Sequence, residues 1–401
     1  MPKIEIYKGE DMAAALSSLG CPSAFVGHKI SPSVINYYFN FLDIGKFAKL
    51  QKAIKGLSVL LREDIKQPKT HKAHFCLQIN RTEREFATFR QLHGNLAGKP
   101  KGSFLLGLNE DNECETYNIE KCPHLLVAGC TNSGKSVFLN SFITCLSCYE
   151  NDCGLVLIDP KKVEFSQFEN NPRLLCPIIT DTTEAILMLN QLCDIMDERY
   201  EKLRQNGLRD NSTGFFPKII IVVDELADLM LTSKKEAEEP LVRIAQKGRA
   251  SGLHLVLATQ RPTVNVVTGL LKANIPCRVA FSMSSIRDSM VLLDYAGANE
   301  LLGKGDALVK LPDRLDTIRI QAPYISTEDI QEIFKDCKPR ETAKIAPKIK
   351  KFSFFDKILG KRNKIENRAD FVEKTAMFEE EREQNLFSVE ELNDFDCFDD
   401  E

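Results

Sequence analysis

Eight consecutive residues of this chain have types and a spacing suited to holding phosphate groups. Residues 129–136 read Gly-Cys-Thr-Asn-Ser-Gly-Lys-Ser, which matches the pattern GxxxxGK[ST]. Glycines let such a loop curl until its backbone N–H groups point at phosphates, and the lysine reaches the β- and γ-phosphates of a nucleotide. The serine that ends the pattern is a magnesium ligand in sites of this kind. The pattern therefore predicts a site for ATP and Mg²⁺.

The predicted nucleotide site is a strand–loop–helix segment. Apolar residues 124–128 precede the loop, and Phe138 and Leu139 begin an apolar helical face after it. The motif requires this context, and the first turn of the helix adds the positive end of its dipole. We expect Lys135 to act on the phosphates during hydrolysis and Ser136 to bind the metal. The predicted nucleotide-binding residues are Gly129, Cys130, Thr131, Asn132, Ser133, Gly134, Lys135, Ser136 and Val137.

A pair of acids, Asp224 and Glu225, directly follows the β-branched run 218–223. In proteins with a phosphate-binding loop, an aspartate that ends such a strand holds magnesium, so Asp224 is our second metal ligand. The adjacent Glu225 is suited to polarise the attacking water as a general base. The pair also suits a helix N-cap, and the two interpretations are compatible. Asp159 ends a similar run, but as a turn residue before Pro160 it requires no function.

The elements that position these residues alternate between strand and helix patterns. Continuous apolar runs, typical of strands covered on both faces, occupy 124–128, 154–159, 218–225, 253–260 and 277–283. A helical pattern with one apolar face covers 183–205. Such alternation predicts an α/β fold with a parallel central sheet and right-handed crossovers.

The N-terminal part of the chain has a different pattern. Residues 1–30 are only weakly patterned, whereas 34–42 and 72–80 read as strands and 44–61 as an amphipathic helix. A short helix is expected within 85–92. We therefore divide the chain into a small α+β domain at 1–98, an α/β motor domain at 99–325, and a basic linker with an acidic, disordered tail at 326–401.

The charge of the chain is unevenly distributed. The 401 residues are 43% hydrophobic and 27% charged, as in a folded protein, and their net charge is −4. Residues 365–401 hold fourteen acids and three bases, so residues 1–364 carry +7. A mildly basic body suits contact with nucleic acid at a restricted surface. The tail is interpreted as solvated, with docking on a protein partner as the alternative.

No segment indicates a membrane or export. The chain has no run of 18 apolar residues, and its N-terminus lacks the pattern of a signal peptide. We therefore expect a cytoplasmic protein without membrane insertion, whose thirteen cysteines are reduced thiols. Cys145 and Cys148 form a CxxC spacing, but no second pair accompanies it, so both are read as small core residues.

Seven strings occur in an order that resembles the motor of FtsK/SpoIIIE DNA translocases over about 103–323. They are HLLVAGCTNSGKS, LIDPKKVEF, CPIITD, MDERY, IIIVVDELADLM, RIAQKGRASGLHLVLATQRPTVNVVTGLLKANIPCRVAFSMSS and LLGKGDALV. Residues 24–95 more loosely resemble the small α domain that precedes the motor in that family. The resemblance implies a RecA-like P-loop ATPase that forms a hexameric ring around double-stranded DNA.

The resemblance also implies roles for further residues. Lys135 and Ser136 would bind nucleotide and magnesium, and Asp224 and Glu225 would supply the metal-side acid and the catalytic base. Gln260 of ATQRP would sense the γ-phosphate and link hydrolysis to movement. Arg249 of QKGRASG would act on the ATP of a neighbouring subunit. The alternatives are a strand-end cap for Gln260 and a surface salt bridge for Arg249.

Contacts with DNA are expected from loops that face the pore. Arg261 and Lys272 match positions that the family uses near the phosphate backbone, where they follow charge without reading sequence. In SMSSIRDS the family often has a basic residue directly after the two serines, where this chain has Ile286. Arg287 is the candidate substitute, and the alternative is that this contact is missing.

The resemblance leaves the ends of the family pattern unmatched. The membrane helices and the C-terminal winged-helix domain of full-length members are not recognisable here, which suits a mobile element, a plasmid or a phage, or a host that supplies targeting separately. The expected function is ATP-driven, sequence-independent pumping of double-stranded DNA in segregation or transfer. The alternatives are a conjugation-coupling or secretion-type ATPase of the same superfamily, and a nucleotide-regulated binding module.

Overall fold

The computed structural model describes residues 7–43, 49–63, 65, 69–71, 74–81, 84, 86–149 and 153–336. The chain forms two compact units. The first comprises Met1–Tyr117, Gly129–Phe142 and Val279–Ile325, and the second comprises Asn118–Ala128, Ile143–Arg278 and Ser326–Glu401. The predicted acidic tail and the first residues of the helix predicted over 44–61 lie outside the described ranges.

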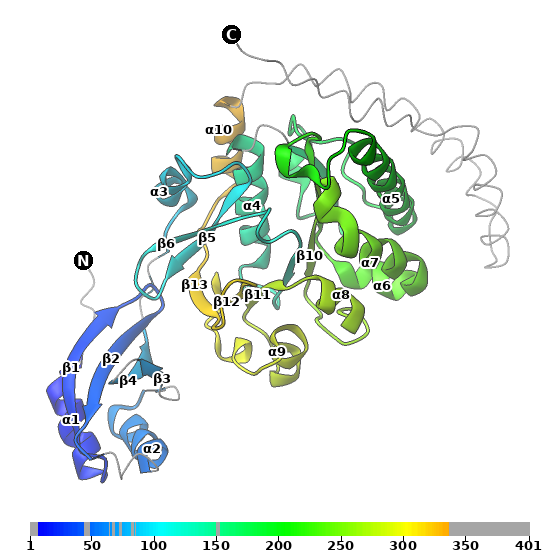
Figure 1. Cartoon of the computed structure of the whole chain (residues 1–401). Coiled ribbons are helices and arrows are strands. Elements are labelled where there is room, and N and C mark those ends of the chain that lie inside the picture. Colours follow the sequence, from blue (N-terminus) through cyan, green and yellow to red (C-terminus); the bar gives the residue numbers. More distant parts are fainter. Residues whose placement is uncertain are drawn as a thin grey trace. The chain divides into compact units, whose positions relative to one another are not determined.

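The first unit begins with a four-stranded antiparallel sheet that carries two helices (blue in Figure 1). Its strands have the order β1-β2-β4-β3. The elements are α1 (Gly9–Ser18), β1 (Ser23–Ile30), β2 (Val34–Phe41), α2 (Leu50–Leu61), β3 (Lys69–His71) and β4 (His74–Asn80). Both helices share one core with the aromatic residues Tyr37, Phe39 and Phe75 of the sheet. Small residues such as Ala13 on the buried face of α1 explain the weak sequence pattern there.

The remainder of the first unit contains the antiparallel part of a larger sheet. Strand β13 pairs antiparallel with β12 and with β5. The elements outside the small sheet that begin in this unit are α3 (Phe89–Leu92), β5 (Ser103–Asn109), β6 (Cys114–Asn118), α4 (Lys135–Tyr149), α9 (Ile286–Leu293), β12 (Asp306–Lys310) and β13 (Ile318–Gln321). The sequence patterns predict no antiparallel strands here, because short, partly exposed strands have a weak pattern.

The second unit contains the parallel strands that the continuous apolar runs predict. Strands β8, β9, β10 and β7 pair in parallel, and all their residues are buried. Figure 1 shows α5, α6 and α7 side by side. The elements are β7 (Leu125–Ala128), β8 (Cys153–Ile158), α5 (Thr182–Gln205), β9 (Lys218–Val223), α6 (Leu226–Thr232), α7 (Lys234–Ser251), β10 (Leu253–Thr259), α8 (Gly269–Asn274), β11 (Cys277–Phe281), whose last residues belong to the first unit, and α10 (Thr327–Asp336).

The larger sheet has nine strands in the order β6-β5-β13-β12-β11-β7-β10-β9-β8. The α/β fold with a mostly parallel central sheet is therefore confirmed, with an antiparallel part that the sequence did not predict. In the described ranges, no helix combines the length and the apolar character needed to cross a bilayer.

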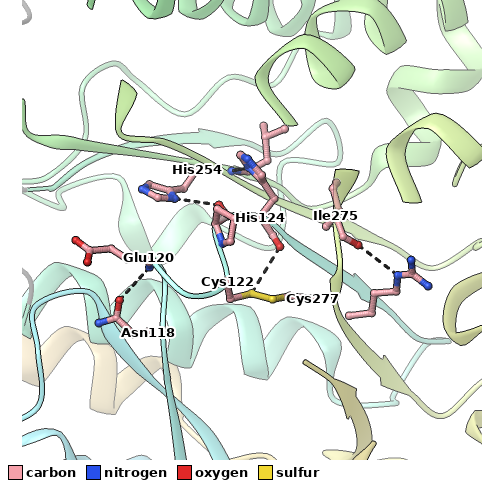
Figure 2. The surroundings of a disulfide bond; sticks show 10 residues. Asn118, Glu120, Cys122, His124, His254, Ile275 and Cys277 are labelled. Carbon is pink, nitrogen blue, oxygen red and sulfur yellow. Dashed lines mark hydrogen bonds between the residues drawn. A yellow bond between two sulfur atoms is a disulfide. The ribbon is translucent and has the colours of Figure 1, made fainter. Parts of the chain in front are cut away.

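Figure 2 shows one pair of cysteines joined as a disulfide in the second unit. Cys122 and Cys277 are 155 residues apart in the chain, and their Cα atoms lie 5.8 Å apart. The expectation that all cysteines are reduced thiols is wrong for this pair. Cysteine spacing could not reveal it, because the pairing depends on β11 lying next to β7 in the sheet. Cys145 and Cys148 take part in no disulfide among the described residues; Cys145 is buried as expected, whereas Cys148 is half-buried.

Two buried histidines lie near this pair (Figure 2). The Nδ1 atom of His124 accepts a hydrogen bond from the Leu255 N–H at 3.0 Å, and His254 Nδ1 lies 2.9 Å from the Pro123 carbonyl oxygen. Burial lowers the pKa of His124 to about 3 and that of His254 to about 4. Both side chains are therefore neutral in the folded protein at ordinary pH.

Acidification is expected to destabilise the fold through these two histidines. Between pH 4 and 6.5 the unfolded chain binds protons that the folded chain excludes, so stability falls as the pH falls, by up to about 1.4 kcal/mol per pH unit for each histidine. Urea unfolding between pH 5 and 7 measures this slope. In a variant with His124→Asn and His254→Asn, the amide groups can still accept at the first position and donate at the second. This variant is expected to show a smaller change of unfolding free energy with pH. Equal slopes would contradict the explanation.

Candidate active site

The phosphate-binding loop lies between β7 and α4 and is shaped by contacts within the first unit. The Cys130 N–H donates to the Ser282 carbonyl at 2.9 Å, and the Ser133 N–H donates to the Cys130 carbonyl at 3.1 Å. Gly134 has a φ of +106°, and a Cβ added there would lie 2.4 Å from the backbone N of Gly305. Only glycine fits this position, which explains the second glycine of the motif.

The side chains of the loop fall into a buried and an exposed group. Ser133 and Lys135 are 1% and 3% exposed, whereas Thr131 and Asn132 are exposed. Lys135 is the first residue of α4, as the motif predicts. The remaining predicted residues are buried or half-buried, namely Gly129, Cys130, Gly134, Ser136 and Val137. The buried ammonium group at the start of a helix provides positive charge where an anion would bind.

The two acids that follow β9 are buried in the second unit. Asp224 is 0% exposed, and its N–H donates to the Ile158 carbonyl of β8 at 3.1 Å. Glu225, rather than Asp224, is the N-cap of α6, where it accepts from the Ala227 N–H at 3.4 Å. The N-cap interpretation is thus correct for the second acid of the pair.

Glu225 also joins three neighbouring strand ends. Its Oε1 accepts from the Thr259 hydroxyl at 2.6 Å, and the Gln260 N–H lies 3.2 Å from each carboxylate oxygen. Lys161 Nζ lies 3.0 Å from Oε2. The carboxylate is therefore held in one orientation by the ends of β10 and β9 and by the loop after β8. Gln260 contacts Glu225 through its backbone N–H, and its role at the γ-phosphate stays a prediction.

The sequence patterns did not single out Lys161, which the structure places on Glu225. Its side chain is 40% exposed, whereas that of Glu225 is 3% exposed. Burial alone would lower the pKa of Lys161, but the hydrogen bond and the charge of Glu225 outweigh it and raise this pKa above its ordinary value. The available signal was its position after a buried strand, at the sheet edge where the acids also lie.

Asp159 shapes the loop that carries Lys161. Its Oδ2 accepts from the Glu164 and Phe165 N–H groups at 2.8 and 3.0 Å. These contacts are those of a residue that organises a turn, in agreement with the interpretation of Asp159 from sequence.

The remaining predicted residues lie mostly on exposed surfaces. Arg249 is exposed near the end of α7, and no salt bridge of Arg249 occurs within the described part of the chain. Arg261 is exposed after β10, and Lys272 is half-buried in α8. Arg287 is exposed in α9 beside Ile286, which is 59% exposed. Arg287 belongs to the first unit and the other three to the second.

The two side chains predicted to bind magnesium carry oxygen donors of a suitable kind. Ser136 offers a half-buried hydroxyl at the start of α4, and Asp224 offers a fully buried carboxylate after β9. Hard oxygen ligands with one or two carboxylates are what Mg²⁺ prefers, usually together with phosphate oxygens. The predicted donor set therefore fits this ion.

The chain is similar in sequence to the FtsK/SpoIIIE family and to curated DNA translocases. The profile of the FtsK/SpoIIIE family matches residues 91–215 and 211–264. The DNA translocase FtsK of Leptospira interrogans is 44% identical over 360 residues, and that of Corynebacterium glutamicum is 37% identical over 352 residues. The alignments cover 84% and 81% of this chain. The chain spans 38% of the length of each of these two relatives.

The fold is similar to that of a solved coupling protein. The pCW3 conjugation coupling protein TcpA, in a monomer form with ATPγS, matches with a TM-score of 0.60 and 22% sequence identity. The match covers 82% of this chain and 99% of that protein. This likeness supports the predicted RecA-like P-loop fold.

Proposed function

Since the chain belongs to the FtsK/SpoIIIE family, we propose that it is an ATPase that moves double-stranded DNA without reading its sequence. The DNA would pass through a ring of identical subunits, for which a hexamer is the expected form. We keep the three-part division at 1–98, 99–325 and 326–401 as part of this proposal. The DNA would belong to a chromosome, a plasmid or a phage and be moved in segregation or transfer.

The phosphate loop is proposed to bind ATP. Its backbone N–H groups and Lys135 would hold the phosphates, because inward-pointing amides and a buried ammonium stabilise negative charge. Ser136 and Asp224 would hold the magnesium ion. When bound, the ion would neutralise charge on the phosphate oxygens.

Glu225 is proposed to accept the proton of the attacking water. A general base must be positioned before its basicity matters, and contacts from Thr259, Gln260 and Lys161 hold this carboxylate in place. Those contacts also supply the observation that best supports a motor. The Glu225 carboxylate, which would take the proton from water, is hydrogen-bonded to Thr259 and Gln260 at the end of β10. This strand continues directly into the segment that carries Arg261.

Arg249 and the DNA-contacting residues would act at the surfaces of the ring. An exposed arginine near the end of α7 suits a role on the ATP of a neighbouring subunit, where such a group stabilises charge in the transition state. Arg261, Lys272 and Arg287 would contact the phosphate backbone of the duplex. The acidic tail is proposed to be a solvated segment, with docking on a protein partner as the alternative.

Long duplex DNA is expected to raise the steady-state ATPase rate several-fold, and the purified chain with ATP is expected to displace streptavidin from biotinylated duplex ends. Because phosphate contacts dominate sequence-independent binding, the DNA concentration for half-maximal stimulation should rise steeply with salt. Displacement that fails without ATP would support movement along DNA. Turnover that is indifferent to DNA would contradict the proposal and favour a secretion-type ATPase of the same superfamily.

A further inference from the structure

A short turn of the first unit, residues 302–305, holds the phosphate loop from the side. The Lys304 N–H donates to the Asn132 carbonyl at 3.2 Å, and the Gly305 N–H donates to the Ser133 carbonyl at 2.7 Å. The contact at Gly134 is close enough that an added Cβ would lie 2.7 Å from the Cα of Gly305. The conformation of the loop therefore depends on where this turn lies.

Two side chains hold the turn through its carbonyl groups. Arg84 donates from Nη1 to the Leu302 carbonyl at 3.2 Å and from Nη2 to the Gly303 carbonyl at 2.9 Å. Gln321 donates from Nε2 to the Lys304 carbonyl at 2.8 Å. Arg84 Nη2 also donates to Gln321 Oε1 at 2.7 Å, so the two side chains support each other.

The same network reaches the four-stranded sheet. The Ser33 hydroxyl, just before β2, donates to Gln321 Oε1 at 2.9 Å and accepts from Arg84 Nη2 at 3.4 Å. Ser33 and Gln321 are 5% and 2% exposed, so water competes little for these bonds. Buried polar groups that are mutually satisfied favour a single arrangement, and losing one member leaves the others unpaired.

We propose that Arg84 and Gln321 are positioning residues for nucleotide binding, and that they couple the four-stranded sheet to the phosphate loop through the 302–305 turn. The proposal rests on the assignment of 129–136 as the nucleotide site. Without the two side chains, the turn loses the donors for three carbonyls, and the loop must be ordered when the nucleotide binds. Coupling of this kind acts in both directions, so bound nucleotide should also slow hydrogen exchange of the amides in the turn.

The test compares Arg84→Ala, Arg84→Lys and Arg81→Ala. Arg81 is a matched control, because it is a second arginine of the same segment and its Nη1 donates to the Ser31 carbonyl between β1 and β2 at 3.1 Å. Arg84→Ala is expected to raise the Kd for a fluorescent ATP analogue and the KM for ATP roughly tenfold, since about 1.4 kcal/mol corresponds to a factor of ten, with a smaller change in kcat. Arg84→Lys, which can donate to fewer carbonyls, should lie between Arg84→Ala and the parent, and Arg81→Ala should bind like the parent.

Hydrogen exchange supplies a readout that general destabilisation would not give. Arg84→Ala should accelerate exchange of the Lys304 and Gly305 amides, whereas amides of β2 and β4 should exchange as in the parent. Parent-like affinity and exchange in Arg84→Ala would overturn the proposal, as would equal weakening by Arg81→Ala. A parent protein that binds no nucleotide would overturn the proposed function and this coupling with it. A parent protein that binds nucleotide, beside an Arg84→Ala variant that binds it equally well, would overturn the coupling alone.

Discussion

Replacing Glu225 by glutamine is expected to lower the steady-state ATPase rate at least ~100-fold while the ATP affinity stays within about threefold of the parent. The substitution removes the negative charge and replaces one carboxylate oxygen by an amide nitrogen, with almost no change in volume. A glutamine oxygen in the position of Oε1 would still accept from Thr259 and from the Gln260 N–H. Its amide would face Lys161, whose side chain is 40% exposed and can turn to water. The fold should therefore be retained, and the loss should fall on the chemical step.

Rapid-mix single-turnover kinetics and equilibrium ATP binding separate these effects. Asp228→Asn is the matched control, because it removes a half-buried carboxylate from the first turn of the same helix. This control should keep most of the parent rate. If the Glu225→Gln protein hydrolysed ATP at a rate close to that of the parent, Glu225 would not be the base.

Replacing Lys135 by alanine is expected to weaken ATP binding at least ~100-fold and to remove both basal and DNA-stimulated turnover. The ammonium group is 3% exposed at the start of α4, where charged hydrogen bonds to phosphate oxygens are strong because water is excluded. Neutral side chains of similar size cannot replace this charge. The contrast with Glu225→Gln, which should bind ATP without cleaving it, distinguishes the two roles.

Isothermal titration with ATP and with ADP measures the loss of affinity at Lys135. Lys310→Ala serves as the control, because the side chain of Lys310 is 38% exposed and pairs at 3.2 Å with that of Asp294, which is 51% exposed. Such exposed pairs contribute little, so this variant should bind and hydrolyse ATP normally. Parent-like affinity in Lys135→Ala would show that the loop at 129–136 is not the nucleotide site.

The phosphate loop and the buried strands could be read from the sequence because their information is local. Eight adjacent residues specify the loop, and Gly134 adopts a backbone conformation that side chains disfavour. Strands β8, β9 and β10 are recognisable because each is a continuous apolar run covered on both faces. Their acids follow at the strand ends, so Asp224 and Glu225 could be predicted without knowledge of the sheet.

The tertiary structure alone decided which distant residues meet. Lys161 and Thr259 are 64 and 34 residues from Glu225, and both reach it because β8 and β10 flank β9. Cys122 and Cys277 are brought together by strand order in the same way, whereas Arg84, which lies in no strand, meets the 302–305 turn through its hydrogen bonds. The order of strands follows from how the apolar faces pack over the whole chain, and no local pattern encodes it. The sequence by itself therefore determined the chemistry of the loop and the acids, whereas packing decided what orients them.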